Sequence, residues 1–398
     1  MISATQHTKR KSGYLPSLDG WRALAILGVL MTHDVAWNIG GHSNASYKGI
    51  GGYGVQLFFA ISGVLITTRI LEEESLVGFF DLRRFYIRRI FRIQPAAMGY
   101  LAVTGLLIAF GVIHDHWFFW LGAVFFFENF AYRGLPLDAG SFFSGHFWTL
   151  AVEEHFYILL SLLLFCVRKY RLAVLVIIYV ILVKAQEYAL WHGMFPAIVQ
   201  RRTYWQLHYL VFPAAFAVAL QKPRVKKWAN LYLRPWAAGS FWIAMFLLHT
   251  LVMHHRDPRS SVFSLQSLLG EADFHFEIFV TFLLGATMLH PKAWSTRFLE
   301  IPPLRFIGKI SYSLYLWHVL FFSRIFPETN VTNSVLLALS NRPAKYLATC
   351  FVATLSYYAL EKPMMRLGHR LAPPALPGRP ELAEESVSAN TSTSCSQS

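Results

Sequence analysis

The sequence predicts an all-α fold: a polytopic membrane helical bundle of about ten transmembrane helices, with one further segment that is re-entrant or short. Two observations lead to this prediction. Of the 398 residues, 55% are hydrophobic and only 15% are charged, which exceeds the apolar content that a soluble core needs. The apolar residues also gather in runs of about 20, the length that a helix needs to cross a bilayer core of about 30 Å.

The expected spans follow one another with short polar connections between them. They are residues 21–40, 52–71, 95–113, 147–167, 172–190, 204–220, 235–254, 274–290, 306–324 and 343–361. Lys and Arg gather in alternate connections, and because cytoplasmic loops are the more basic ones, both termini are expected in the cytoplasm. This bias accounts for the net charge of +14, so a nucleic-acid partner is not expected.

Two segments do not fit a simple span. Residues 115–132 are apolar, but a further crossing there would invert every later span, so we expect this segment to be re-entrant or short and buried. Residues 72–94 interleave arginine with Phe, Tyr and Ile at helical spacing, which predicts an amphipathic helix lying in the membrane interface. The small residues at 60–64 predict that two helices approach closely there.

The ends of the chain and its cysteines narrow the possibilities. The first apolar run follows a polar, basic stretch and no small-residue cleavage site comes after it, so residues 1–13 are expected to remain as a cytoplasmic tail. Residues 372–398 are Pro-rich, then acidic and Ser-rich, which predicts a disordered cytoplasmic tail. Cys166, Cys350 and Cys395 lie far apart without a CxxC pair, so neither a disulfide framework nor a metal site is expected.

Ionisable residues within the expected spans mark a candidate site, because each costs about 2.5–3.5 kcal/mol to insert at bilayer depth. Arg22 and His33 are eleven residues apart, so one helix carries both on one face, roughly 16 Å from each other. The helical rise from the expected span ends puts His33, Glu153 and His318 at one depth, roughly 18 Å from the inner surface. Any one of them could simply join two helices by a hydrogen bond. Three such groups at one depth, above an arginine, favour a catalytic site.

The chemistry of these residue types suits acyl transfer. Histidine titrates near neutrality and can accept a proton from an attacking hydroxyl, while a carboxylate beside it fixes its tautomer. His33, His318, Glu153 and the neighbouring Glu154 are therefore the catalytic candidates, with Glu153 expected to orient His33. An alternative in which His33 itself carries the acyl group briefly stays open.

Arginines and hydroxyl groups supply candidate binding residues. Arg89 and Arg92 are three residues apart and so share a helix face. They either anchor the chain to anionic lipid or, together with Arg22, bind the phosphate-bearing donor, for which the planar guanidinium is well suited. Such a donor cannot cross the bilayer and must bind from the inner face. Near His318 lie further residues that either bind substrate or pack: Ser311, Tyr312 and Tyr315.

Six segments, in this order, resemble the acyltransferase 3 family, the membrane O-acyltransferases of bacterial polysaccharides, O-antigen, Nod factors and some macrolides. The segments are LDGWRALAILGVLMTH (18–33, an R-x10-H pattern), GVQLFFAISGVLI (54–66), FYIRRIFRIQP (85–95), FWTLAVEEHFYIL (147–159), ISYSLYLWH (310–318) and YALEKP (358–363). The resemblance covers residues 14–366 and makes 14–371 one transmembrane acyltransferase domain.

This resemblance implies a multi-pass membrane enzyme, of the inner membrane if the source is bacterial. Its donor would be cytoplasmic acyl-CoA, acetyl-CoA in the first instance, with no tightly bound cofactor. Its acceptor would be a hydroxyl of a cell-envelope or exported carbohydrate or glycolipid. The resemblance matches Arg22 and His33 to the family's essential pair, Glu153 to its WSLAVEE-like motif, and Arg89 with Arg92 to its RxxR. Without the C-terminal SGNH esterase-like domain of larger members, the chain is expected to act as a stand-alone transferase.

Two other functions stay open at this stage. The same chemistry could serve a macrolide or another small secondary metabolite. A transporter or flippase of glycolipid would instead use buried His and Glu as a proton relay, although the pseudo-symmetric halves common in that class are not evident. The residues do not specify the acyl group, the acceptor or the oligomeric state.

Overall fold

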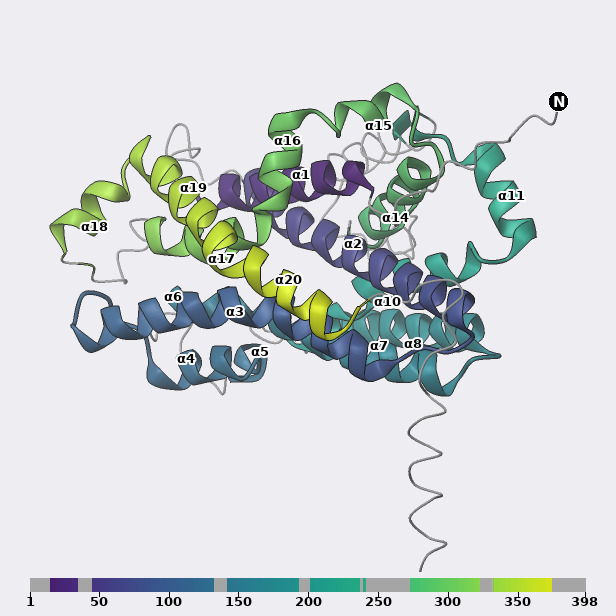
Figure 1. Cartoon of the computed structure of the whole chain (residues 1–398), viewed down its shortest axis with the longest axis horizontal. Coiled ribbons are helices and arrows are strands. Elements are labelled where there is room, and N and C mark those ends of the chain that lie inside the picture. Colours follow the sequence, from purple (N-terminus) through teal and green to yellow (C-terminus); the bar gives the residue numbers. More distant parts are fainter. Residues whose placement is uncertain are drawn as a thin grey trace, which may run out of the picture.

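The fold is known from a computed structural model that describes residues 15–34, 45–131, 142–192, 201–236, 239–240, 273–322, 331 and 333–373. The secondary structure of these residues is helical, and many of the long helices run along the long axis of the molecule (Figure 1). The predicted all-α class is therefore confirmed.

The helices of the first half are α1 (Pro16–Thr32), α2 (Ala45–Val77), α3 (Leu82–Ala109), α4 (Trp117–Val124), α5 (Glu128–Ala131), α6 (Phe142–Gly145), α7 (Phe147–Cys166) and α8 (Arg171–Trp191). Those of the second half are α9 (Thr203–Gln206), α10 (His208–Ala219), α11 (Pro223–Tyr232), α14 (Asp273–Leu289), α15 (Trp294–Phe298), α16 (Pro302–Lys309), α17 (Ser311–Phe321), α18 (Ser334–Leu339), α19 (Ala344–Ser356) and α20 (Lys362–Leu371). A π-helical turn, Tyr357–Glu361, joins α19 to α20.

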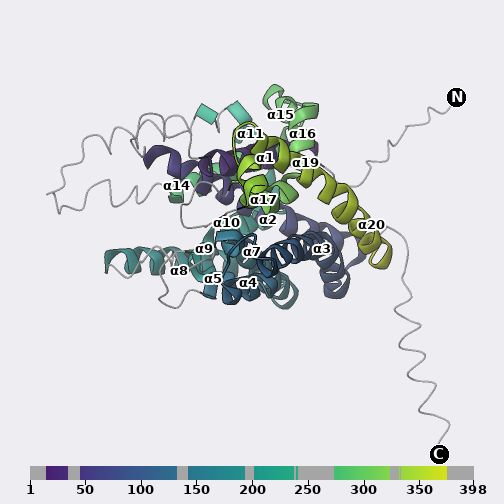
Figure 2. The same ribbon diagram turned by 90° about the vertical axis from the view of Figure 1, so that its left-hand side faces the viewer.

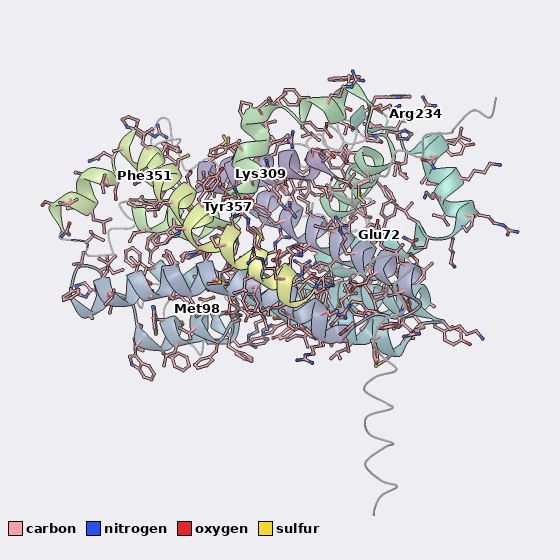
Figure 3. All side chains as sticks on the ribbon, viewed as in Figure 1. Glu72, Met98, Arg234, Lys309, Phe351 and Tyr357 are labelled. Carbon is pink, nitrogen blue, oxygen red and sulfur yellow. The ribbon has the colours of Figure 1, made fainter. Side chains whose placement is uncertain are left out.

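Within the described residues, four helical stretches are long and apolar enough to cross a bilayer. They are Gly51–Val77, Leu82–Ala109, Phe142–Cys166 and Arg171–Ala189. The last of these, in α8, is the least covered, with 11% of its apolar window buried, and it lies at the edge of the bundle in Figure 2. Phe351 on α19 is 71% exposed and points outward (Figure 3). Apolar surface on this scale indicates a membrane protein.

Several expected spans correspond to observed helices. Residues 147–167 and 172–190 are close to the bounds of α7 and α8, and 274–290 to those of α14. The expected span 306–324 is interrupted at Ile310, where α16 ends and α17 begins. The described part of the segment 115–132, residues 115–131, contains two short helices, α4 and α5, each too short to cross a bilayer. The expected span 235–254 and both tails lie almost entirely outside the described residues, and the number of spans and their orientation stay predictions.

The expected interfacial helix at 72–94 is wrong. Residues 72–77 are the end of α2, and residues 82–94 are the beginning of α3, which continues through Pro95 to Ala109. The break between them comes at Gly78, whose φ of 81° suits glycine. Asp81 then starts α3 by accepting a hydrogen bond from the backbone N–H of Arg84, 3.1 Å away. An ion pair of 2.6 Å between Arg88 and Glu73 closes this hairpin.

Ion pairs also identify the two ends of the bundle. At one end, Glu74 of α2 pairs with Arg171 of α8 at 2.5 Å. At the other, Asp34 follows the last turn of α1 and pairs with Lys345 of α19 at 2.6 Å. We call these the Glu74 end and the Asp34 end. The chain therefore runs between them several times, and residues far apart in the sequence meet at matching heights.

Glycines allow the central helices to approach closely. A Cβ on Gly63 would lie 2.5 Å from the carbonyl oxygen of Leu210 in α10, so the close contact predicted for residues 60–64 is confirmed. The tightest contact joins α1 to α16, where a Cβ on Gly308 would lie 1.8 Å from the carbonyl oxygen of Asp19. This contact holds α16 against the part of α1 that carries Arg22.

We expect Gly308→Ala to destabilise the protein by about 1–3 kcal/mol, because the methyl group meets backbone that cannot turn away. Gly52→Ala is the matched control, since Gly52 is helical and a Cβ there would meet nothing within 4 Å. Alanine at that position should stabilise the helix by about 0.5–1 kcal/mol. Thermal unfolding of the detergent-solubilised proteins compares the two, and equal melting temperatures would contradict the tight α1–α16 contact.

Candidate active site

A cavity of about 1040 Å³ opens between the helices. Its walls come from α1, α2, α3, α7, α16, α17, the π-helical turn and α20. One part of the cavity lies near the Glu74 end of the bundle, where its lining includes Arg69, Glu72 and Arg88. The volume is at the upper limit of the range of about 300–1,000 Å³ that is usual for ligand sites, so the cavity can hold a large substrate.

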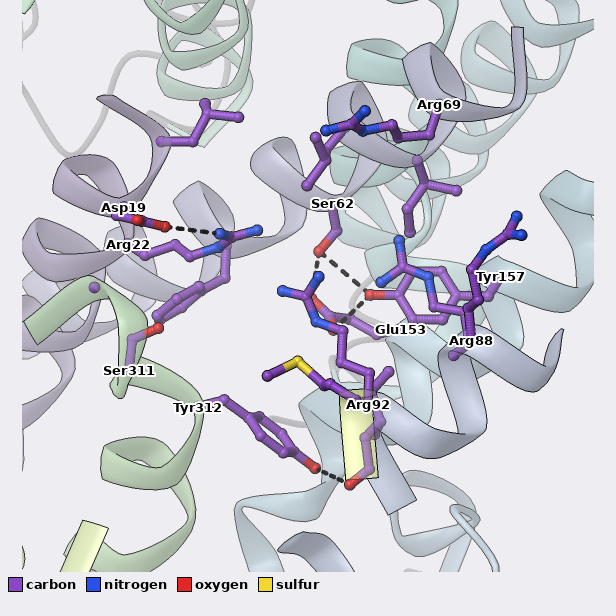
Figure 4. Close-up of a pocket in the computed structure, with 18 of the residues that line it drawn as sticks. Asp19, Arg22, Ser62, Arg69, Arg88, Arg92, Glu153, Tyr157, Ser311 and Tyr312 are labelled. Atoms are coloured by element: carbon purple, nitrogen blue, oxygen red, sulfur yellow. Dashed lines mark hydrogen bonds and ion pairs between the residues drawn. The ribbon is translucent and has the colours of Figure 1, made fainter. Parts of the chain in front are cut away.

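Three arginines predicted to bind a donor face this cavity. Arg22 reaches it from α1 and Arg92 from α3 (Figure 4). Arg89, also on α3, lines it too. Arg22 donates a hydrogen bond to Asp19 at 3.3 Å, and the guanidinium of Arg89 lies 4.8 Å from the ring centre of Tyr157. Among the described carboxylates, none lies within 4 Å of Arg89 or Arg92. The cavity therefore presents positive charge to an incoming anion.

Glu153 supplies a carboxylate to the same cavity. It accepts hydrogen bonds of 2.9 Å from the hydroxyls of Ser62 and Tyr157 (Figure 4). Glu153 and Tyr157 belong to a stripe on α7 that also includes Thr149 and His146, because these residues are spaced by three, four and four. Glu154 does not line the cavity and forms no hydrogen bond with a described residue, so the structure separates the two carboxylates that the sequence paired.

Three histidines meet towards the Asp34 end, beyond the cavity. The ring centres of His33 and His318 are 4.9 Å apart, and that of His146 lies 5.9 Å from His318. We call these three residues the histidine cluster. Nδ1 of His33 lies 2.9 Å from the carbonyl oxygen of Val29, and Nδ1 of His318 lies 2.7 Å from that of Tyr315. A carbonyl can only accept, so each neutral ring holds its proton on Nδ1 and leaves Nε2 as a base.

This geometry corrects the prediction that Glu153 orients His33. Glu153 bonds to Ser62 and Tyr157, whereas the ring of His33 is oriented by its own helix at Val29. The residue of α7 that reaches the histidine cluster is His146, seven residues before Glu153. The rise of a helix separates those two positions by roughly 10 Å. The predicted meeting of His33 with His318 does occur.

The predicted substrate-binding residues lie on α17 along the wall of the cavity. Ser311, Tyr312 and Tyr315 all line it. The hydroxyl of Tyr312 donates to the carbonyl oxygen of Ile93 at 2.9 Å. Tyr315 forms the boundary with the histidine cluster, since its ring centre lies 5.6 Å from that of His318. His33 and His318 are not part of the cavity lining, so the site consists of the cavity and the adjoining histidine cluster, which meet at Tyr315.

An ion-pair cluster borders the histidines at the Asp34 end. The carboxylate of Asp34, the residue after His33, accepts hydrogen bonds from Lys345 at 2.6 Å, from Arg342 at 2.7 Å and from Tyr346. Asp34 is buried, and its three partners lie at the start of α19 or just before it. These bonds fix the end of α1 to α19.

Sequence reasoning missed four of these residues. Tyr157 could have been found, because it is four residues after Glu153 on the same helix face. His146 directly precedes the segment 147–159 and could have been found in the same way. Ser62 and Asp34 carry no such signal, because their partners lie 91 or more residues away in the sequence.

Comparison with known proteins adds to this geometry. The chain matches the acyltransferase 3 family, described as an acyltransferase domain, over residues 15–361. The chain belongs to the acyltransferase 3 family. It is 26% identical over 388 residues to the peptidoglycan O-acetyltransferase OatA of Listeria monocytogenes, covering 91% of this chain and 57% of the relative. It is 27% identical over 383 residues to the O-acetyltransferase OatA of Staphylococcus aureus, covering 90% of this chain and 58% of the relative.

The match to an acyltransferase domain includes all three arginines of the cavity and all three histidines of the cluster. The chain spans little more than half the length of these curated relatives. No solved structure matches the chain.

Proposed function

We propose that this chain transfers an acetyl group from acetyl-CoA to a hydroxyl of a cell-envelope glycan. The observation that carries the proposal is the cavity lined by Arg22, Arg89 and Arg92, which extends to a boundary with three neighbouring histidines. Membership of an acyltransferase family supports the reaction class. The names of the relatives support O-acetylation and a peptidoglycan-type acceptor.

The donor enters from the Glu74 end, which faces the cytoplasm. Its phosphates bind Arg89 and Arg92, whose guanidinium groups are not engaged by a described carboxylate, and planar guanidinium groups bind phosphate oxygens in pairs. Its thioester arm extends past Arg22 towards Tyr315. Along α1, Arg22 and His33 are separated by roughly 16 Å, so the arm must be extended to bring the thioester to the histidine cluster.

The acceptor enters from the Asp34 end and places a hydroxyl beside Nε2 of His33. Nε2 accepts the hydroxyl proton while the oxygen attacks the carbonyl carbon of the thioester. Collapse of the tetrahedral intermediate breaks the C–S bond, forms the O-acetyl ester and returns the proton from His33 to the thiolate of coenzyme A. His318 lies close enough to share the proton in the meantime, and Glu153 binds the donor arm from the cavity wall.

Arg92→Gln tests the donor site. We expect it to raise the KM for acetyl-CoA about 10- to 100-fold with little change in kcat, because a charge-assisted hydrogen bond of about 1.5–3 kcal/mol is lost from binding. The measurement is transfer of radiolabelled acetyl from acetyl-CoA to soluble peptidoglycan fragments by membranes that carry the chain.

Arg83→Gln is the matched control, because Arg83 is exposed on the same helix and does not line the cavity. Its KM should equal that of the wild type. An Arg92→Gln variant with the same KM as Arg83→Gln would contradict a role of Arg92 in donor binding. A wild-type chain that transfers no label to the fragments would contradict the proposed acceptor class.

A further inference from the structure

The proposed acyl transfer also needs a hydrogen-bond donor for the oxyanion, and none of the residues above has that role. As a hydroxyl attacks the thioester, the carbonyl oxygen becomes an oxyanion, and enzymes stabilise it with hydrogen-bond donors fixed in place beforehand. The neutral rings of His33 and His318 cannot serve, because their N–H groups are engaged with the carbonyls of Val29 and Tyr315. Arg22 cannot serve beside His33, because it lies roughly 16 Å away along α1. A further donor is found where the cavity meets the histidine cluster.

Tyr315 is at that boundary. It lines the cavity, it is 7% exposed, and its ring centre lies 5.5 Å from that of His146 and 5.6 Å from that of His318. A thioester that extends from the cavity to the histidines must therefore pass directly beside its hydroxyl. Thr149, which also lines the cavity, lies next to that hydroxyl with an oxygen–oxygen distance of 2.7 Å.

The hydrogen bonds of Tyr315 allow its hydroxyl to leave its present acceptor and donate to another. The phenol donates to the main-chain carbonyl of His146 at 2.9 Å, and with its only proton used there it can accept a bond from the Thr149 hydroxyl. The Thr149 hydroxyl also lies 3.2 Å from the same carbonyl and can donate to it instead. A bond accepted from Thr149 polarises the phenol and strengthens its own donation. His146 is the N-cap of α7, where the carbonyl also accepts the first bond of the helix. The carbonyl therefore keeps a partner when the phenol turns away.

We propose that Tyr315 is a catalytic residue whose hydroxyl donates a hydrogen bond to the thioester oxygen as negative charge develops there. The inference rests on the proposed acetyl transfer. The acceptor oxygen forms a bond to the carbonyl carbon, the π electron pair moves to the oxygen held by Tyr315, and His33 takes the hydroxyl proton. When the pair returns, the C–S bond breaks, the thiolate takes the proton from His33, and Tyr315 resumes its bond to His146. Thr149 is a positioning residue, since it acts through the phenol.

Tyr315→Phe keeps the ring and removes only the hydroxyl. We expect kcat for release of free thiol from acetyl-CoA, in the presence of soluble peptidoglycan fragments, to fall about 100- to 1,000-fold, the loss typical of one oxyanion donor. The KM for acetyl-CoA should change less than about threefold, because the bond forms mainly in the transition state. Thr149→Val should lower kcat less, about 10-fold, with KM again unchanged.

Tyr100→Phe is the matched control. Tyr100 is fully buried, and its hydroxyl donates to the main-chain carbonyl of Phe143 at 2.7 Å. Its ring centre lies 5.3 Å from that of His146, as close as that of Tyr315, but Tyr100 does not line the cavity. Its kcat should stay within about threefold of the wild type, so a loss specific to Tyr315→Phe cannot come from general loosening around the histidines. An unchanged KM in the same membranes shows that Tyr315→Phe is folded.

The outcomes distinguish a failure of the proposed role of Tyr315 from a failure of the proposed acetyl transfer. Near-normal kcat in Tyr315→Phe, beside an inactive His33→Ala, would overturn the role of Tyr315 and leave the proposed transfer intact. Equal losses in Tyr315→Phe and Tyr100→Phe would also overturn it, as a packing effect. A wild-type chain that releases no thiol would overturn the proposed function itself.

Discussion

Replacing His33 with alanine is expected to lower the rate of acetyl transfer by about 100- to 10,000-fold, the contribution usual for a general base. His33 is the residue of α1 whose ring reaches His318, with ring centres 4.9 Å apart. Its Nδ1 is held by the carbonyl oxygen of Val29, which leaves Nε2 oriented and free of a proton in the neutral ring. Alanine removes that base without filling its place. The measurement is incorporation of acetyl esters into peptidoglycan fragments at saturating acetyl-CoA.

His155→Ala is the matched control for this loss. His155 is on α7, is partly buried, and bonds through Nδ1 to the hydroxyl of Thr203 at 2.7 Å, outside the cavity and the histidine cluster. Its removal should leave the transfer rate within a few-fold of the wild type. If His33→Ala retained the wild-type rate, the histidine cluster would not be the place where the hydroxyl loses its proton. A transporter in which this imidazole relays protons would be favoured by a different result, movement of glycolipid across the membrane without loss of the thioester.

The meeting of His33 with His318 was predictable because helix geometry is regular. A rise of about 1.5 Å per residue placed both rings at one depth. The same rise, together with the turn of a helix, placed Arg22 on the His33 face. Arg22 lies in the cavity and His33 lies beyond it, as that geometry requires. The break at Ile310, within the expected span of His318, did not prevent this meeting.

The position of Glu153 could not be predicted in the same way, because correct bounds for α7 do not fix its height relative to α1 and α17. The stripe of α7 that faces the site begins at His146, which meets His318 itself and leaves Glu153 two turns lower, beside Tyr157. Depth along one helix also says nothing about its rotation relative to the next. Glu154 shows this second limit, because one step of about 100° takes it off the face that lines the cavity.

The arginines of residues 72–94 were misplaced for a different reason. Arginine alternating with aromatic residues at helical spacing is the usual pattern of a helix lying on a membrane. Here the polar side of α3 instead faces an internal cavity, through Arg89 and Arg92. A sequence pattern distinguishes polar from apolar faces, but a buried polar cavity and an aqueous interface produce the same pattern. The ion pair between Arg88 and Glu73, which folds α3 back on α2, forms only in the tertiary structure.

Asp34 had no sequence signal, because its partners lie more than 300 residues away. Its carboxylate is 2% exposed and bonds to two cations and a phenol. Neutralising it leaves the ammonium of Lys345 buried, which is the costly way to break an ion pair. We therefore expect Asp34→Asn to destabilise the protein by about 3 kcal/mol, at the lower end of the range for buried pairs. The lower end applies because the side chain of Arg342 is 42% exposed and can turn to water.

Glu187→Gln is the matched control, because it makes the same change from carboxylate to amide. Glu187 pairs with Lys184, and their side chains are 41% and 69% exposed, respectively. This change should cost less than Asp34→Asn, because both side chains are on the surface of α8, where the lysine can extend its ammonium towards the headgroups. The melting temperature in detergent should therefore fall by several degrees in Asp34→Asn and hardly at all in Glu187→Gln. Similar melting temperatures in the two variants would show that the Asp34 cluster does not hold α1 to α19.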